Sequence, residues 1–170
     1  MAAPAVRVSI RHDDFDIGAE VAALRAGDGG VGAVATFIGT VRDRSDGASV
    51  ASMELEHYPG MTEAAIEAMI DEAFARFDIR AARVIHRIGE LAAREQIVLV
   101  AVASAHRGQA FQACEFLMDY LKTSAPFWKK ETTDAGARWV DARVADDAAL
   151  ARWGIEAGNA AAPSPAPPHG

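Results

Sequence analysis

The hydrophobic period of the chain changes at Gly108, and this change constrains the fold more than any other feature. The residues before it, 96–105, form an apolar run rich in valine, which is typical of a β-strand. The residues after it follow the 3.6-residue period of a helix with one apolar face. The apolar positions are Phe111, Cys114, Leu117, Met118 and Leu121, and the polar positions between them are Gln112, Glu115, Asp119 and Lys122. The sequence therefore predicts a strand followed directly by an amphipathic helix.

The same two periods predict the other elements. We expect further strands at residues 6–10, 32–41, 50–57, 81–88, 127–131 and 138–143, and further helices at 19–26, 63–76 and 146–153. The apolar run at 32–41 is typical of a central strand covered on both faces, and 50–57 is predicted to be its hairpin partner. Hairpins mixed with helices predict an α+β fold, in which a mixed, largely antiparallel sheet packs against helices.

Composition narrows the class of protein. With 170 residues, of which 51% are hydrophobic, the chain can form one domain, predicted at 1–153, followed by a disordered Ala/Pro-rich tail at 154–170. The formal charge of −7 argues against a broad nucleic-acid surface. No apolar run reaches the roughly 20 residues of a membrane span, and the N-terminus lacks a secretory signal pattern, so a cytoplasmic protein is expected. A single cysteine excludes an intramolecular disulfide.

All three lysines lie within one short segment, Met118 to Glu131, whereas the other fourteen basic residues are arginines. Only an amine can lose its proton near neutral pH and act as a nucleophile or base. Lys122 falls in the last turn of the predicted helix, Pro126 ends that helix, and the chain then becomes extended. In an extended segment Lys129 and Lys130 point in opposite directions, so only one of them can share a site with Lys122. The alternative is that all three lysines are structural.

Two places can bind an anion. His106 and Arg107 stand where the strand gives way to the helix, so an imidazole, a guanidinium and free backbone N–H groups can converge there. Arg42 follows the strand at 32–41, at a loop position that often carries binding residues. Each of these side chains can equally be a solvent-facing residue without function.

Other kinds of site find no support. The chain has no Gly-x-Ser-x-Gly elbow, glycine-rich phosphate loop or His-Glu-x-x-His helix. His57 and His86 are interpreted as structural, because no second metal ligand lies at a suitable spacing from either. Cys114 is predicted to pack in the core rather than react. No cofactor and no metal are therefore expected.

Four blocks of sequence carry a resemblance to a known family. They are residues 55–61 (LEHYPGM), 84–90 (VIHRIGE), 104–107 (SAHR) and 118–131 (MDYLKTSAPFWKKE). In this order they resemble the large, catalytic subunit family of molybdopterin synthase, over roughly residues 6–153. The resemblance implies an α/β hammerhead-type fold and a homodimer. It also implies a ubiquitin-like small subunit at each end of that dimer, giving a heterotetramer, with a C-terminal Gly-Gly thiocarboxylate that enters a pocket of the large subunit.

The resemblance also implies roles for particular residues. Lys122 and Lys129 would be the catalytic amines of a sulfurtransferase. The pocket residues would be Phe37, Arg42, His106, Arg107 and Met118, with Arg143 supplied to the neighbouring subunit's site. The substrate would be cyclic pyranopterin monophosphate, which receives two sulfurs on adjacent carbons and becomes the dithiolene of molybdopterin. The sequence departs from the family pattern in two places. Ser124 stands where a basic residue is expected, and the Pro-rich tail has no counterpart in the family core.

Two other functions remain open on the residues alone. The first is a non-catalytic dimeric domain that binds a phosphorylated metabolite and regulates a partner, using the same arginines but not the amines. The second is an acyl- or phosphoryl-transfer enzyme that uses a lysine, although neither a metal site nor a phosphate loop accompanies it. Lys122→Arg separates catalysis from regulation, because arginine keeps the charge but cannot serve as nucleophile or base.

Overall fold

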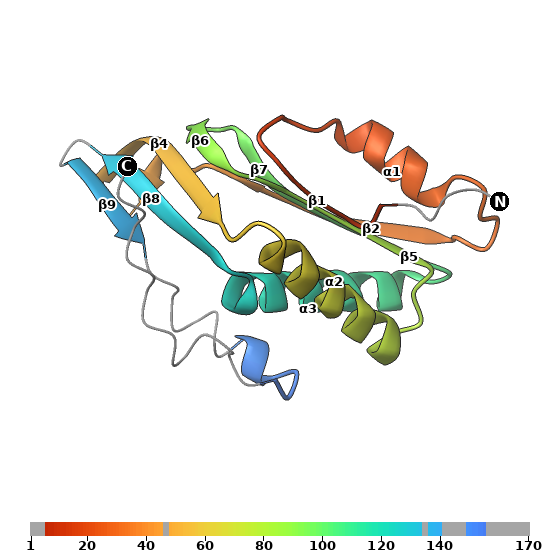
Figure 1. The fold of residues 1–170 in the computed structure, drawn as a ribbon. Coiled ribbons are helices and arrows are strands. Elements are labelled where there is room, and N and C mark those ends of the chain that lie inside the picture. Colours follow the sequence, from red (N-terminus) through yellow and green to blue (C-terminus); the bar gives the residue numbers. More distant parts are fainter. Residues whose placement is uncertain (1–5, 46–47, 134–135, 141–148, 156–170) are drawn as a thin grey trace.

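The computed structural model describes residues 6–45, 48–133, 136–140 and 149–155 (Figure 1). The helices are α1 (Ile17–Arg25), α2 (Met61–Arg76) and α3 (Arg107–Ser124). The strands are β1 (Val8–Arg11), β2 (Ala33–Thr40), β3 (Arg44–Ser45), β4 (Ala48–His57), β5 (Ala81–Arg87), β6 (Gly89–Ala92), β7 (Gln96–Ser104), β8 (Phe127–Thr133) and β9 (Gly136–Val140). The predicted α+β class is confirmed. No helix in this described part of the chain is long and apolar enough to cross a membrane.

The first sheet has the strand order β1-β5-β7-β2, in which β1 pairs with β5 in parallel and the other pairs are antiparallel. Helix α1 lies on one face of this sheet, and α2 and α3 lie on the other (Figure 1). Strand β7 is at the centre, and its residues from Val98 to Ser104 are all buried. A strand buried on both faces reads as a continuous apolar run, which explains why β7 gives the clearest strand signal in the sequence.

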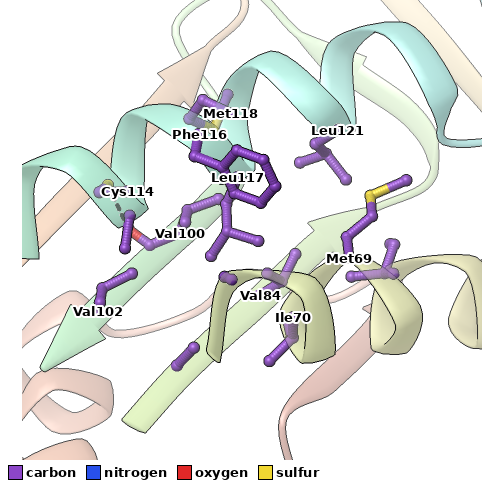
Figure 2. Close-up of a cluster of buried hydrophobic side chains, with 14 of the residues drawn as sticks. Met69, Ile70, Val84, Val100, Val102, Cys114, Phe116, Leu117, Met118 and Leu121 are labelled. Atoms are coloured by element: carbon purple, nitrogen blue, oxygen red, sulfur yellow. Dashed lines mark hydrogen bonds between the residues drawn. The ribbon is translucent and has the colours of Figure 1, made fainter. Parts of the chain in front are cut away.

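The main core lies between this sheet and the two helices α2 and α3 (Figure 2). Leu117 and Phe116 of α3 meet Met69 and Ile70 of α2, above Val100 of the central strand. Burial of these large side chains gives the fold its main stabilisation, at about 25 cal/mol for each Å² of apolar surface removed from water. Because α3 is held along most of its length by this core, the ends of α3 have defined positions.

The second sheet has the order β3-β4-β8-β9, and β6 pairs with β4 at its side. Its buried side chains form a separate cluster of Val41, Met53, Leu55 and Leu91. Val41 comes directly after β2, so this cluster joins the end of the first sheet to the second. The second sheet therefore stands at the end of the first sheet where β2 ends and β7 begins.

Three details of the predicted architecture are wrong. β2 is an edge strand rather than a central one, since β7 is the one strand that pairs with it among the described residues. The strand at 48–57 pairs with β6 and β8 rather than with β2, because the β3–β4 hairpin turns the chain out of the first sheet. The prediction also has no strand at residues 89–92, where the structure has β6, and Gly89 at its start takes a positive φ of 83° that allows the chain to change sheet.

Most of the predicted helical stripes are confirmed. Cys114, Leu117, Met118 and Leu121 are buried, but Phe111 is 65% exposed. The predicted strand at 138–143 is present as β9 up to Val140, and helical residues occur at 149–151 of the predicted C-terminal helix. Residues 141–148 and the predicted tail beyond 155 lie outside the described residues. The domain boundary at 153 stays a prediction.

Candidate functional site

Lys122 lies in the last turn of α3 and its side chain is exposed. The helix ends two residues later, its C-cap Ala125 has extended dihedral angles, and Pro126 follows before β8 begins. A cation in the last turn interacts favourably with the helix dipole. Within the described residues, the Lys122 amine makes no hydrogen bond or ion pair. An exposed amine at the end of a well-packed helix is placed to reach a bound molecule.

Strand register separates the two adjacent lysines. Lys129 lies opposite Leu55 and Lys130 lies opposite Glu54 in the antiparallel pairing of β8 with β4. Residues directly opposite in such a pair share a face, so Lys129 lies on the face of buried Leu55, and Lys130 lies on the other face. The prediction that Lys129 and Lys130 point in opposite directions is confirmed. Phe127, two residues before Lys129, lies on the same face as Lys129.

A buried histidine connects the two lysine-bearing elements. The His86 ring on β5 stacks on Phe127, with centroids 3.8 Å apart and planes 17° apart. His86 Nδ1 lies 2.8 Å from the Arg87 carbonyl oxygen, which can only accept, so Nδ1 carries the proton. Burial, together with the smaller effect of the nearby charge of Lys122, lowers the pKa of His86 to about 4. His86 is therefore a neutral imidazole close to the Lys122 ammonium.

A second histidine adjoins the same ring. His57, opposite Phe127 on β4, has its ring centroid 6.3 Å from that of Phe127. Its Nδ1 is buried and has no hydrogen-bond partner in the described structure. The Nε1 of Trp128, on the other face of β8, is also buried and has no hydrogen-bond partner in the described structure. Unpaired buried polar atoms are costly in a folded protein and are frequent where a ligand or a partner completes a site.

Arg42 is at the same end of the molecule as the lysines. It follows Val41, which packs in the cluster that contains Leu55, and Leu55 lies opposite Lys129. The Arg42 side chain is exposed. The structure thus brings Arg42 to the region where α3 ends and the second sheet begins, as a site with Lys122 and Lys129 requires.

His106 and Arg107 are not brought to these lysines within one chain. His106 is the N-cap of α3 and Arg107 is its first residue, and both side chains are exposed. From Arg107 to Lys122 the helix rises about 22 Å, at 1.5 Å per residue. The predicted convergence of all the basic residues on one pocket therefore does not occur inside a single chain.

The remaining predicted pocket residues differ in accessibility. Phe37 lies on the edge strand β2 and is 37% exposed, whereas Met118 is packed in the main core and is 8% exposed. Arg143 lies outside the described residues. Sequence reasoning missed the stacking of His86 on Phe127, because the strands that carry them belong to different sheets and are distant in sequence.

The structure also has an open groove far from the lysines, with a volume of about 540 Å³ between α1, α2 and the start of β5. Its arginines are already paired: Arg7 with Glu67, Arg80 with Asp28, and Arg83 with Glu20. No group of three or more possible metal ligands occurs among the described residues. The end of α3 is the better candidate site, since its amines are not all committed to partners.

Comparison with known proteins identifies the family of the chain. The family model described as "MoaE protein" matches residues 10–124. The molybdopterin synthase catalytic subunit of Ralstonia nicotianae is 65% identical over 94% of this chain and 89% of its own length. The MoaE protein of Burkholderia ambifaria superposes with a TM-score of 0.77 at 58% identity, covering 89% of this chain and all of that one. Molybdopterin synthase from Staphylococcus aureus gives a TM-score of 0.73 at 29% identity, covering 78% of this chain and 96% of that one.

The family model spans residues from the second half of β1 to the end of α3, which include three of the four blocks and the first half of the fourth. The chain belongs to the MoaE family of molybdopterin synthase catalytic subunits.

Proposed function

We propose that this chain catalyses the transfer of sulfur from a thiocarboxylated, ubiquitin-like small subunit to cyclic pyranopterin monophosphate, forming the dithiolene of molybdopterin. The observation that carries the proposal is the placement of Lys122 and Lys129. The charge of Lys122 on α3 acts on His86, and Lys129 lies on the same face of β8 as Phe127, the ring on which the neutral His86 stacks. The third amine, that of Lys130, belongs to the opposite face of β8.

The sulfur has to arrive on another molecule. Cys114 is 7% exposed, its Sγ lies 3.8 Å from the Val100 carbonyl oxygen, and burial raises the pKa of its thiol to about 11. A thiol in this state is neither a good nucleophile nor accessible to a partner. A thiocarboxylate at the C-terminus of a small partner supplies the sulfur instead: its sulfur bonds to a substrate carbon, and water then hydrolyses the resulting thioester, which leaves the sulfur on the substrate and a carboxylate on the partner. Two such transfers to adjacent carbons complete the dithiolene.

The two amines have different surroundings and are assigned different roles. Lys122 is exposed at a helix end, so it can engage the partner's terminal carbonyl or the substrate. Lys129 is half-buried beside a hydrophobic cluster and takes part in proton transfer and charge stabilisation. Because His86 is neutral, it adds no positive charge that would repel either ammonium group. Arg42 contributes an anion contact for the substrate phosphate at the same end of the chain.

The site takes residues from two copies of the chain. His106 and Arg107 are about 22 Å from Lys122 along α3, so they cannot hold the phosphate of a substrate that also touches the Lys122 of the same chain. In a homodimer with twofold symmetry, the N-terminus of α3 of one copy can complete the pocket at the C-terminus of α3 of the other. Arg143 of one copy is likewise proposed to enter the site of the other copy. The cytoplasm is the proposed compartment, which agrees with the single free thiol of Cys114.

The test compares Lys122→Arg with Lys130→Arg in a reaction with thiocarboxylated small subunit and cyclic pyranopterin monophosphate. Both variants keep the charge and remove the amine, so they are matched. We expect Lys122→Arg to lose dithiolene formation by a factor of 100 or more, on the order of a lost acid–base or nucleophilic group, and Lys130→Arg to stay within about two-fold of the parent. Full dithiolene formation by Lys122→Arg would contradict the catalytic role of this amine. A parent chain that forms no dithiolene, and that binds a phosphorylated metabolite equally well with lysine or arginine at position 122, would support the regulatory domain instead.

A further inference from the structure

The polar face of α3 puts carboxylates next to Lys122. Glu115, Asp119 and Lys122 are spaced by four and three residues, so they follow one stripe along the helix surface. An aspartate three residues before a lysine is well placed to form an ion pair with it. Such a pair would hold the Lys122 amine in its charged form and direct it back along the helix.

The structure shows a different partner for these carboxylates. Arg152 Nη2 donates to Asp119 Oδ2 at 2.8 Å and also to the Glu115 carboxylate. Trp153 Nε1 donates to the same Asp119 oxygen at 2.7 Å. The Asp119 side chain is only 17% exposed, whereas that of Glu115 is 57% exposed. Asp119 is therefore the carboxylate that the C-terminal segment holds most closely.

Trp153 is itself held in place from three sides. Its ring makes edge contacts with Phe77, at a centroid distance of 5.8 Å, and with Phe116, at 5.5 Å. The Trp153 carbonyl accepts a hydrogen bond of 2.6 Å from Arg76 of α2. Arg152 lies over the Trp153 ring at 5.3 Å. The indole N–H is thus a fixed donor, and it aims at Asp119.

The Lys122 amine has no ion-pair partner among the described residues, even though Asp119 is one turn away. On the other elements, His86 of β5 is close enough for the charge of Lys122 to lower its pKa, and this imidazole is neutral. Asp119 is therefore the nearby carboxylate on its own helix that can capture the amine.

We propose that Arg152 and Trp153 are positioning residues for Lys122, because they hold the Asp119 carboxylate and so keep it from pairing with the Lys122 amine. The consequence for the reaction rests on the proposed function of Lys122. Neither residue needs to touch the substrate. Their effect on sulfur transfer acts through Asp119, and it disappears when Asp119 has no charge.

The experiment measures the reactivity of the amine directly. The full chain is treated with a small excess of acetic anhydride at fixed pH, and mass spectrometry gives the rate of Lys122 acetylation relative to that of Lys130. The parent is compared with Arg152→Gln/Trp153→Phe, in which Asp119 is released but an aromatic ring still packs on Phe77 and Phe116. We expect the relative rate at Lys122 to fall by up to about five-fold, the range of an exposed ion pair.

Rescue separates this role from a merely structural one. Asp119→Asn keeps the shape of the side chain but removes its charge, so the same double substitution in that background is expected to leave the Lys122 rate unchanged. An unchanged rate in the original double variant would overturn the proposal, and so would an equal fall in the Asp119→Asn background. If the double variant has no cooperative thermal transition, Trp153→Phe alone replaces it, with a smaller fall expected and the same rescue.

The acetylation experiment tests the positioning of the Lys122 amine whether or not the proposed function is correct. If acetylation of Lys122 falls and is rescued, but sulfur transfer by the same variants is unchanged, the positioning of the amine is supported and the catalytic role of Lys122 fails. If both fall and both are rescued, the two proposals stand together.

Discussion

The imidazole of His86 and the phenyl ring of Phe127 lie face to face, 3.8 Å apart, and they join the two sheets of the protein. His86 is near the end of β5 in the first sheet, and Phe127 begins β8 in the second sheet. The stack therefore sets where β8 starts after α3 ends, and with it the position of Lys129 two residues later. A neutral aromatic pair is suited to this place, because a charged imidazole would repel both amines.

Acidification should destabilise the protein through His86. The pKa of this group is lowered from 6.5 to about 4 by burial, so between these pH values the unfolded chain binds a proton that the folded chain does not. The free energy of unfolding therefore falls as pH drops from 6.5 to 4, by at most about 3 kcal/mol. Urea unfolding at several pH values measures this fall. In His86→Phe the fall should be smaller, and equal slopes in both proteins would contradict the assignment.

Removal of the only thiol should leave sulfur transfer intact. Cys114 is buried and its thiol pKa is raised to about 11, so Cys114→Ala is expected to form dithiolene at the parent rate, with a small loss of stability from the cavity. In the parent, a disulfide reagent such as dithionitrobenzoate should react slowly with the folded chain at pH 7.5 and rapidly in urea. Loss of activity in a folded Cys114→Ala protein would show that this sulfur takes part.

Mixing two inactive variants should restore activity if each site draws on two copies. Arg107→Ala and Lys122→Ala remove residues from opposite ends of α3. In a hybrid dimer of the two, one site lacks both residues and the other is complete. Equal mixing by unfolding and refolding should then recover roughly a quarter of the parent activity, since half of the dimers are hybrids and half of their sites are complete. Mixtures as inactive as the separate variants would place each site within one chain.

A methyl group at Gly32 should disturb the entry to α3. Gly32 donates its N–H to the Ser104 carbonyl at 2.9 Å, and an added Cβ would lie 2.2 Å from the Ala105 carbonyl oxygen. The backbone next to His106 would have to move, so Gly32→Ala is expected to lower the unfolding free energy by about 1–3 kcal/mol. Gly29→Ala is the control, because nothing lies within 4 Å of its added Cβ. Urea unfolding of both variants measures the difference in stability. Equal stability would contradict the close approach of Gly32 to the Ala105 carbonyl oxygen.

The helix that carries Lys122 could be predicted because its signals are local. The apolar positions of α3 recur every three to four residues, and Pro126 prevents the helix from continuing. The opposite directions of Lys129 and Lys130 follow from the two-residue period of any strand, whatever its partner. The strand predicted at 32–41 also rests on local signals and is confirmed as β2, whereas its predicted central position in the sheet is wrong. β2 is at the edge, where Thr36 and Phe37 are exposed despite the apolar character of the run.

The sequence by itself determined most of the helices and strands, the opposite directions of Lys129 and Lys130, and the burial of the thiol. Each of these depends on residues within a few positions of one another. Only the tertiary structure decided that His86 meets Phe127 and that Trp153 holds Asp119. Those relationships depend on strand pairing and helix packing between distant segments, which burial of the shared core selects and which no local period encodes.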